Sequence, residues 1–163
     1  MNEHNTAQLN NAELVEAYAA GPAELRTVVE DLTDGGLRAR PVAGLWSTLE
    51  VVCHIADFEI VFADRLKRAL AEENPTIFAG NPDEFAAGLK YEQRSIENEL
   101  AVIDVIRRHI TEILRQLKPA DFRRTARHSE AGELTFAQLL AHVTNHIPHH
   151  IEKIREKRVL LGK

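Results

Sequence analysis

Four of the eight histidines lie within nine positions near the end of the chain, in the stretch HVTNHIPHHIEKI (142–154). His142, His146 and His150 are spaced four residues apart, so on an α-helix their side chains share one face, while His149 lies about 100° away. A buried imidazole without a partner costs on the order of 1–3 kcal/mol. Neutral imidazole is a common ligand of zinc, nickel, copper and iron. The spacing therefore indicates a metal site and leaves open which pair of histidines contributes to it.

A third ligand has to come from another segment. His54 lies in EVVCHIADFE, where apolar neighbours indicate a core-facing helix, and a facing helix could bring it near His146 and His150. The alternative is a core histidine that is hydrogen-bonded to a carbonyl or to Asp57. The other histidines fall in an N-terminal tail, among arginines on a solvated face, and in a polar loop; they are His4, His109 and His128.

Pro148 lies between His146 and His150. It has no N–H to bond the carbonyl of Thr144, and its ring crowds that turn, so it should bend the helix or widen it locally. The bend is either a tolerated kink or a device that adjusts how the two imidazoles point.

Four long stretches with apolar residues at helical spacing must position these side chains. They are residues 10–33, 47–73, 84–117 and 135–159. Gly21–Pro22 should interrupt the first, Ser47 and Thr135 can cap the second and fourth, and Pro119 marks the end of the third. The segments 33–41, 73–85 and 120–135 read as loops, and none of the chain alternates as a strand. The pattern predicts an all-α four-helix bundle in a single domain over residues 1–163, with residues 1–9 as a flexible tail.

The composition is that of a globular protein, with 163 residues, 44% hydrophobic and 28% charged, and a net charge of −5. No basic stripe with aromatics is present, which argues against nucleic acid as a partner. Cys53 is the only cysteine, so it cannot form an internal disulfide and reads as buried packing. The polar start of the chain and the short apolar runs predict a cytoplasmic protein with no membrane partner.

Three segments together resemble the DinB/YfiT superfamily. They are LWSTLEVVCHIADFE (45–59), GELTFAQLLAHV (132–143) and NHIPHHIEKI (145–154). The resemblance implies a DinB-like four-helix bundle with an up-down-down-up arrangement, commonly a homodimer. It also implies a divalent metal ion, usually zinc or nickel, held by three histidines.

Carried over position by position, the implied ligands are His54, His146 and His150. The resemblance thus favours the 146/150 pair over 142/146. His142 and His149 fall outside the family's ligand pattern and are expected beside the site or on the surface.

Three neutral ligands would leave a metal ion with an open position for water or substrate, and the ion would lower the pKa of a bound water or thiol. Two reactions follow for a small-molecule substrate. One is hydrolysis of an amide or ester, which would benefit from a general base such as Glu50 or Asp57, one turn on either side of His54. The other is transfer of a low-molecular-weight thiol to an electrophile. The resemblance suggests the second, because some relatives are similar to transferases or isomerases that use bacillithiol or mycothiol.

Quieter roles are expected for the neighbours of His54. Glu50 fits a capping box with Ser47, Asp57 could orient an imidazole, and Trp46 reads as a core anchor. No catalytic residue beyond the ligands is assigned. Two alternatives stay open: a non-catalytic metal-binding stress-response dimer in which the ion stabilises the fold, and a metal-free histidine cluster that senses pH.

Overall fold

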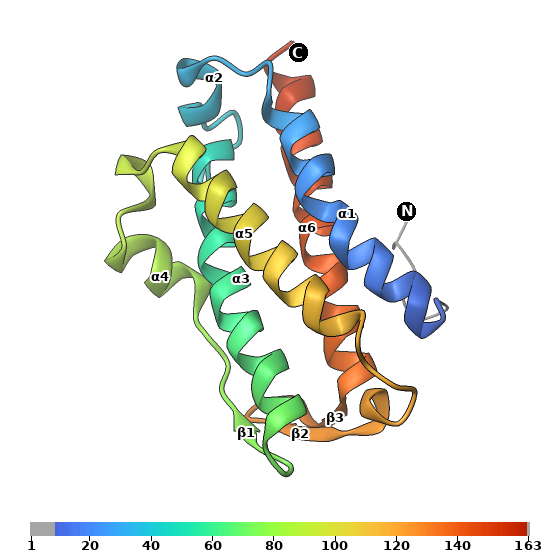
Figure 1. Ribbon diagram of the computed structural model, residues 1–163. Helices are drawn as coiled ribbons and strands as arrows, with labels where there is room; N and C mark the ends of the chain where they lie inside the picture. The colour runs from blue at the N-terminus through green and yellow to red at the C-terminus, as the bar shows by residue number, and fades with distance from the viewer. Residues whose placement is uncertain (1–8, 163) are drawn as a thin grey trace.

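Four long helices form the bundle in the computed structural model, which describes residues 9–162. They are α1 (Asn11–Val29), α3 (Thr48–Ala71), α5 (Ile96–Leu114) and α6 (Phe136–Leu160). In Figure 1, α1 and α6 run upward, and α3 and α5 run downward. Helices α1 and α3 each pack against both α5 and α6. The expected up-down-down-up four-helix bundle is therefore confirmed, and the predicted residues 1–8 of the tail lie outside the described residues.

Three of the long helices begin with a capping box. The N-cap side chain accepts a backbone N–H from the third helical residue, whose own side chain accepts the N-cap N–H. The pairs are Asn10–Glu13, Ser47–Glu50 and Thr135–Gln138. Each N-cap side chain stabilises its helix by about 1 kcal/mol. The helix starts that were predicted at Ser47 and Thr135 are thus correct.

Helix α1 runs without a break through Gly21 and Pro22, so the predicted interruption is wrong. Pro22 cannot donate to the carbonyl of Tyr18, which is the acceptor four residues earlier. The guanidinium of Arg107 on α5 donates to that oxygen instead, over 2.8 Å. A Cβ at Gly21 would stand 3.1 Å from the side chain of Ile147, so glycine allows α6 to approach. Tertiary contacts have replaced the missing helical hydrogen bond.

The predicted helix 84–117 is divided. A short helix α4 (Pro82–Gly88) and a 3₁₀ turn η2 (Tyr91–Gln93) precede α5. Lys90 has a left-handed backbone with φ 51°, which stops α4 from continuing. Another short helix, α2 (Asp34–Arg38), lies in the segment predicted as a loop, where the Thr33 side chain accepts the N–H of Gly36.

A small sheet closes the lower end of the bundle, where only loops were predicted (Figure 1). Its strands are β1 (Thr76–Ile77), β2 (Thr125–His128) and β3 (Gly132–Thr135), in the order β1-β2-β3, and the 3₁₀ turn η3 (Asp121–Arg123) precedes β2. β1 pairs with β2 in parallel, and β2 pairs with β3 antiparallel, with Ala126 opposite Leu134. Ile77 and Ala126 are buried under the sheet. Strands of two to four residues are too short to alternate visibly in sequence.

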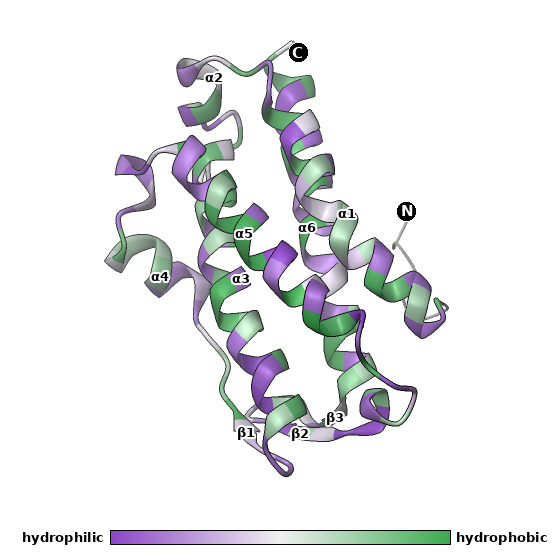
Figure 2. Ribbon diagram, viewed as in Figure 1, coloured by the Kyte–Doolittle hydropathy of each residue, from purple (hydrophilic) through white to green (hydrophobic). Residues whose placement is uncertain are grey.

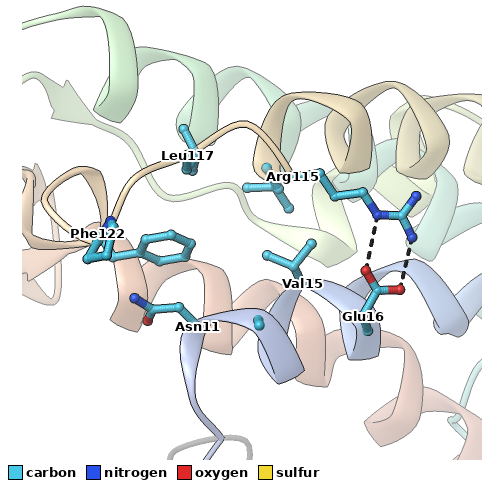
Figure 3. Close-up of a pocket in the computed structure, with 9 residues that line it drawn as sticks. Asn11, Val15, Glu16, Arg115, Leu117 and Phe122 are labelled. Atoms are coloured by element: carbon cyan, nitrogen blue, oxygen red, sulfur yellow. Dashed lines mark hydrogen bonds and ion pairs between the residues drawn. The ribbon is translucent and has the colours of Figure 1, made fainter.

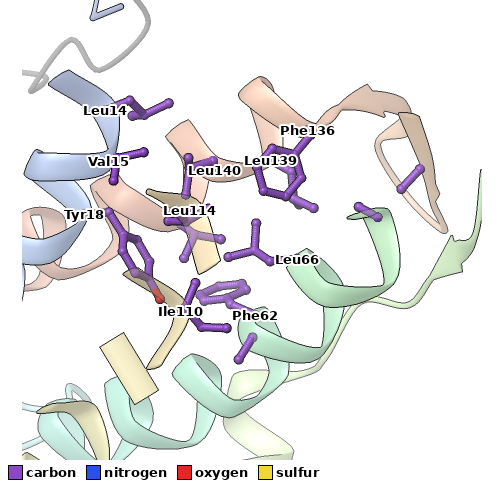
Figure 4. Packing of buried hydrophobic residues seen from close by; sticks show 14 of the residues in the cluster. Leu14, Val15, Tyr18, Phe62, Leu66, Ile110, Leu114, Phe136, Leu139 and Leu140 are labelled. Atoms are coloured by element: carbon purple, nitrogen blue, oxygen red, sulfur yellow. The ribbon is translucent and has the colours of Figure 1, made fainter. Parts of the chain in front are cut away.

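The core follows the inner faces of the four long helices. Each of them carries both apolar and polar residues in Figure 2, as amphipathic helices in a bundle do. The apolar cluster of Figure 4 occupies the lower part of the bundle and joins all four helices; among its members are Tyr18, Phe62, Leu66, Ile110, Leu114, Phe136 and Leu140. No helix within residues 9–162 is long and apolar enough to cross a membrane.

One ion pair lies inside this core. Arg107 on α5 is 1% exposed and Glu59 on α3 is fully buried, and two guanidinium nitrogens donate to the carboxylate over 2.5 and 2.7 Å. The same guanidinium donates to the carbonyls of Tyr18 on α1 and Val143 on α6 and stacks 4.0 Å from the Tyr18 ring. Arg107 therefore contacts all three other long helices. The expectation that the arginines beside His109 are solvated is wrong for Arg107.

Candidate metal centre

His54, His146 and His150 converge between α3 and α6, which are adjacent antiparallel helices (Figure 1). The Nε2 atoms of His54 and His146 are 3.0 Å apart. The ring of His150 lies 4.8 Å from that of His54 and 4.6 Å from that of His146, between ring centres. One ring nitrogen from each residue lies within 4.8 Å of the other two. The fold thus brings together the three histidines that the sequence singled out, and their role as metal ligands stays a prediction.

The hydrogen bonding of this cluster is incomplete. The Nδ1 atoms of His54 and His146 are buried, and neither has a hydrogen-bond partner in the described part of the chain. Their Nε2 atoms face each other, so at most one of the two can donate to the other. A cation between the rings would use both lone pairs. At about 2.0–2.1 Å from each nitrogen it would hold them roughly 3.3 Å apart, a separation close to that observed.

All three imidazoles are held in the neutral form. Burial lowers the pKa of His54 to about 4 and that of His150 to about 3. Burial also lowers the pKa of His146 well below its usual value, and the neighbouring His150 and His54 lower it further. Neutral imidazoles are what a metal ion binds, so at pH 7 the cluster presents three nitrogen donors without loss of a proton.

Aromatic rings enclose the cluster on its α3 side. The ring of Phe58 lies 4.5 Å from that of His54, Phe62 lies 5.0 Å from His146, and Trp46 lies 5.1 Å from His54. Trp46 also packs against the apolar core, as predicted, but its contact with His54 places it at the site as well. An apolar wall of this kind lowers the local dielectric and strengthens the electrostatic effect of any bound ion.

Of the two roles considered for Glu50, general base and capping-box residue, the structure supports the second. Its carboxylate accepts the backbone N–H of Ser47 over 2.7 Å and the guanidinium of Arg40 over 2.6 Å. These hydrogen bonds outweigh its desolvation and lower its pKa. The predicted capping box is confirmed, and the carboxylate is committed to it.

Asp57 does not orient an imidazole, contrary to expectation. It accepts a hydrogen bond from Arg94 over 2.8 Å, and Arg94 also binds Glu99. The Nδ1 atom of His54, three residues earlier on α3, is left without an acceptor. The competing arginine comes from the segment between η2 and α5, which sequence spacing could not place there.

The remaining side chains near the site have clear positions. Cys53 is fully buried, and burial raises the pKa of its thiol to about 12, in agreement with a packing role. Asp83, in the first turn of α4, is exposed, and its charge raises the pKa of His54. Sequence reasoning missed Asp83 because it expected a loop there.

The other described histidines contribute no nitrogen to the three-nitrogen cluster, although two of them lie beside it. His142 and His149 are exposed on α6, where the ring of His149 lies 5.2 Å from that of His150 and the ring of His142 lies 5.9 Å from that of Phe62. His109 is exposed on α5. His128 in β2 accepts two backbone N–H groups of the following turn. His4 lies outside the described residues. Helix α6 continues through Pro148, so this proline does not end the helix between the two converging histidines.

A separate cavity of about 280 Å³ lies between the start of α1 and the end of α5 (Figure 3). Its lining is mostly apolar, including Val15, Leu117 and Phe122, and the Glu16–Arg115 ion pair closes one side. None of the histidines lines it, so it offers no donor set comparable to the cluster.

Comparison with known proteins places the chain in a family. A protein from Oceanobacillus iheyensis named "Putative metal-dependent hydrolase" is 32% identical over 133 residues, which cover 82% of this chain and 77% of that protein. A protein of the same description from Geobacillus kaustophilus is 30% identical over 92% of this chain and 85% of its own length.

Two solved structures share the fold. YfiT from Bacillus subtilis, described as a probable metal-dependent hydrolase with an unusual four-helix bundle topology, has a TM-score of 0.86 at 24% identity, over 99% of this chain and 90% of its own. The mycothiol-dependent maleylpyruvate isomerase has a TM-score of 0.72 at 11% identity, over 91% of this chain and 62% of its own. The sequence model of the DinB superfamily matches residues 17–154, and the chain therefore belongs to the DinB superfamily.

Proposed function

We propose that this protein is a divalent-metal-dependent enzyme that transfers a low-molecular-weight thiol, of the bacillithiol or mycothiol type, to an electrophilic substrate. His54, His146 and His150 would hold the ion, with zinc or nickel as the metal. The observation that carries the proposal is the convergence of three neutral imidazoles, in which the Nε2 atoms of His54 and His146 face each other over 3.0 Å. At most one of these two atoms can donate to the other, and a cation between them would bind the lone pairs of both.

A bound divalent ion would lower the pKa of a thiol and so supply a thiolate at neutral pH. In the transfer, the sulfur forms a bond to the electrophilic carbon, the leaving group departs with its electron pair, and the thiol proton passes to solvent. The rings of Trp46, Phe58 and Phe62 keep bulk water from one side of the cluster. Excluding water limits hydrolysis of the electrophilic substrate, a reaction that would compete with attack by the thiolate.

The state of the carboxylates supports thiol transfer over hydrolysis. Hydrolysis would benefit from a general base close to the attacking water. On α3, Glu50, Asp57 and Glu59 are each bound to an arginine and so are poor bases. Thiol transfer depends less on such a base, because a free thiol is already far more acidic than water.

A metal-dependent hydrolase is the second candidate, and one residue favours it. Asp83 is exposed, lies at the start of α4, and is near enough to raise the pKa of His54. Of the two carboxylates whose charge acts on His54, Asp57 is paired with Arg94, so Asp83 is the candidate to accept a proton from a water molecule at the cluster. The names of the relatives from Oceanobacillus and Geobacillus agree with this alternative.

The two candidates are separated by assaying zinc- and nickel-loaded protein in parallel. Thiol transfer is measured with bacillithiol, mycothiol and simple thiols against chlorodinitrobenzene, and hydrolysis with a panel of nitrophenyl esters and anilides. The thiol transferase predicts thiol-dependent turnover that Asp83→Asn leaves intact. Thiol-independent ester or amide cleavage that Asp83→Asn abolishes would establish the hydrolase instead. Metal binding without either activity would favour a non-catalytic metal-binding role.

We also infer a homodimer, which rests on the family resemblance. The chain has a mass of 18.3 kDa, so light scattering on a sizing column should give about twice that mass. A monomer mass over the working concentration range would exclude the dimer.

A further inference from the structure

Two arginines are buried in the described part of the chain, and only one of them has an anionic partner there. Arg107 is 1% exposed and binds Glu59, as described above. Arg65 on α3 is 6% exposed, and no carboxylate within residues 9–162 lies at ion-pair distance from it. Its one hydrogen bond among the described residues goes to the carbonyl of Phe78, and its Nε is buried without a partner. A buried cation normally has an anionic partner.

Arg65 lies on the same face of α3 as the histidine cluster. His54, Phe58, Phe62 and Arg65 follow one another at helical spacing, and side chains lean toward the start of a helix, which here is toward His54. The Phe62 ring is 5.0 Å from the ring of His146 and 5.4 Å from the guanidinium carbon of Arg65. The guanidinium is therefore separated from the cluster by a single aromatic ring.

The surrounding charges leave the Arg65 cation uncompensated. Asp64 and Glu130 raise its pKa through their charge, but desolvation outweighs them and lowers it. Asp64 makes its ion pair with Arg68 instead. The guanidinium fork of arginine matches a carboxylate, with two parallel hydrogen bonds.

We propose that Arg65 binds a carboxylate on the molecule that reacts at His54, His146 and His150. This inference rests on the proposed function, because it requires a ligand at the cluster. The backbones of His54 and Arg65 are roughly 16 Å apart along α3. After both side chains are taken into account, a ligand joining the two points has to span on the order of 10 Å. The expected reactant is thus an elongated acid with its reactive group at the opposite end from its carboxylate.

The competing explanation is that Arg65 only anchors a loop. By binding the Phe78 carbonyl it holds the segment between β1 and α4, and this segment packs on the site, since a Cβ at Gly80 would touch Phe58 at 3.4 Å. Loss of a loop anchor would weaken charged and neutral ligands equally. Loss of an anion-binding residue would weaken only the charged one.

The experiment compares two thiols of equal length on cobalt-substituted protein. 6-Mercaptohexanoate and 6-mercaptohexanol are titrated while the sulfur-to-cobalt charge-transfer band is recorded. We expect the wild type to bind the acid about tenfold more tightly than the alcohol, as one charge-assisted pair implies. Arg65→Met should bring this ratio to about one, and Arg65→Lys should retain part of it. Arg68→Met is the matched control, because Arg68 is exposed on the same helix, and it should keep the wild-type ratio.

A second pair of probes tests the case in which the carboxylate belongs to the other reactant and not to the thiol. The monohydroxamate of adipic acid and its methyl ester are titrated into zinc-loaded protein, and the fluorescence of Trp46, the only tryptophan, reports binding. A preference for the acid that Arg65→Met removes, in either pair, supports the proposal and shows which reactant carries the acid. Equal binding of acid and neutral probe in both pairs, or a preference that survives Arg65→Met, overturns it.

Failure of the proposed function would look different. If neither thiol produces a charge-transfer band, the thiol chemistry is wrong, while the hydroxamate pair still decides the role of Arg65. If both thiols bind with equal affinity, the thiol chemistry stands, and a carboxylate on the thiol is excluded.

Discussion

The Glu59–Arg107 pair and the histidine cluster are both buried polar groups between α3 and the helices that face it, yet only one of them is complete. Arg107 has a carboxylate, two carbonyls and an aromatic face as partners. His54 and His146 face each other through their Nε2 atoms, where at most one can donate, and a ring nitrogen of His150 lies beside them. A complete group fixes how the helices pack. An incomplete one, held in place by the same packing, is suited to bind something from outside.

The largest effect on stability should come from breaking the Glu59–Arg107 pair. Glu59→Leu leaves Arg107 as an uncompensated buried charge, and we expect a loss of about 3–5 kcal/mol in the free energy of unfolding. Urea unfolding followed by circular dichroism measures it. Glu59→Leu combined with Arg107→Met removes both charges and should cost less than the single substitution. A single substitution that costs under about 1 kcal/mol would contradict this account.

At the histidine cluster, in contrast, a bound metal ion should stabilise the folded protein. Zinc at 1,000 times its dissociation constant should raise the free energy of unfolding by about 4 kcal/mol, because it binds only the folded cluster. Thermal unfolding with and without zinc measures this gain. His146→Ala should abolish it, and His109→Ala, on the exposed face of α5, should not. An equal zinc effect in both variants would show that the ion binds elsewhere.

Without metal, the same cluster should make stability depend on pH. The pKa of His54 is about 4 and that of His150 about 3 in the folded state, against an ordinary value of 6.5. The unfolded chain therefore takes up protons first as the pH falls, and stability declines below pH 6.5. Each of the two contributes up to about 1.4 kcal/mol per pH unit until its folded pKa is reached. Urea unfolding of chelator-treated protein from pH 7.5 to 4.5 checks this slope.

A substitution at His54 tests whether the histidine cluster causes this pH dependence of stability. His54→Gln should reduce the slope between pH 6.5 and 4, and His109→Gln should leave it unchanged. A slope that is the same in wild type and His54→Gln would show that the cluster is not its source.

The smallest effect is expected at the N-cap of α3, a structural position on the helix that carries His54. Ser47→Ala removes the N-cap of α3 and should cost about 1 kcal/mol, measured by urea unfolding. Because Glu50 serves the cap and Arg40 rather than the cluster, the zinc content per chain should not change. Loss of zinc in Ser47→Ala would indicate that Glu50 acts at the metal centre.

The sequence predicted what depends on local pattern. The capping box at Ser47 and Glu50, the helical face that carries His146 and His150, and the placement of His54 on a core-facing helix are all readable over one or two turns. The family resemblance indicated which histidines would act together, namely His54, His146 and His150. The structure brings these three together from two helices that are far apart in the chain.

What the sequence did not predict depends on contacts between distant segments. Pro22 looks like a break until Arg107, 85 positions later in the numbering, supplies the missing hydrogen bond. Arg107 itself sits among charged residues and reads as solvated until Glu59 faces it. The sequence position of Asp57 allows it to orient His54, but in the structure Asp57 accepts a hydrogen bond from Arg94, which comes from another segment. Charges that pair over long separations leave no periodic signal.

Measuring how much metal the protein binds decides whether the histidine cluster is a metal site. Protein purified without chelator and reloaded with zinc or nickel is analysed by plasma mass spectrometry, beside His54→Ala, His150→Ala and the exposed control His109→Ala. We expect about one ion per chain in the wild type and in His109→Ala, and almost none in His54→Ala and His150→Ala. Negligible metal in the wild type, or equal metal in all four proteins, would contradict it.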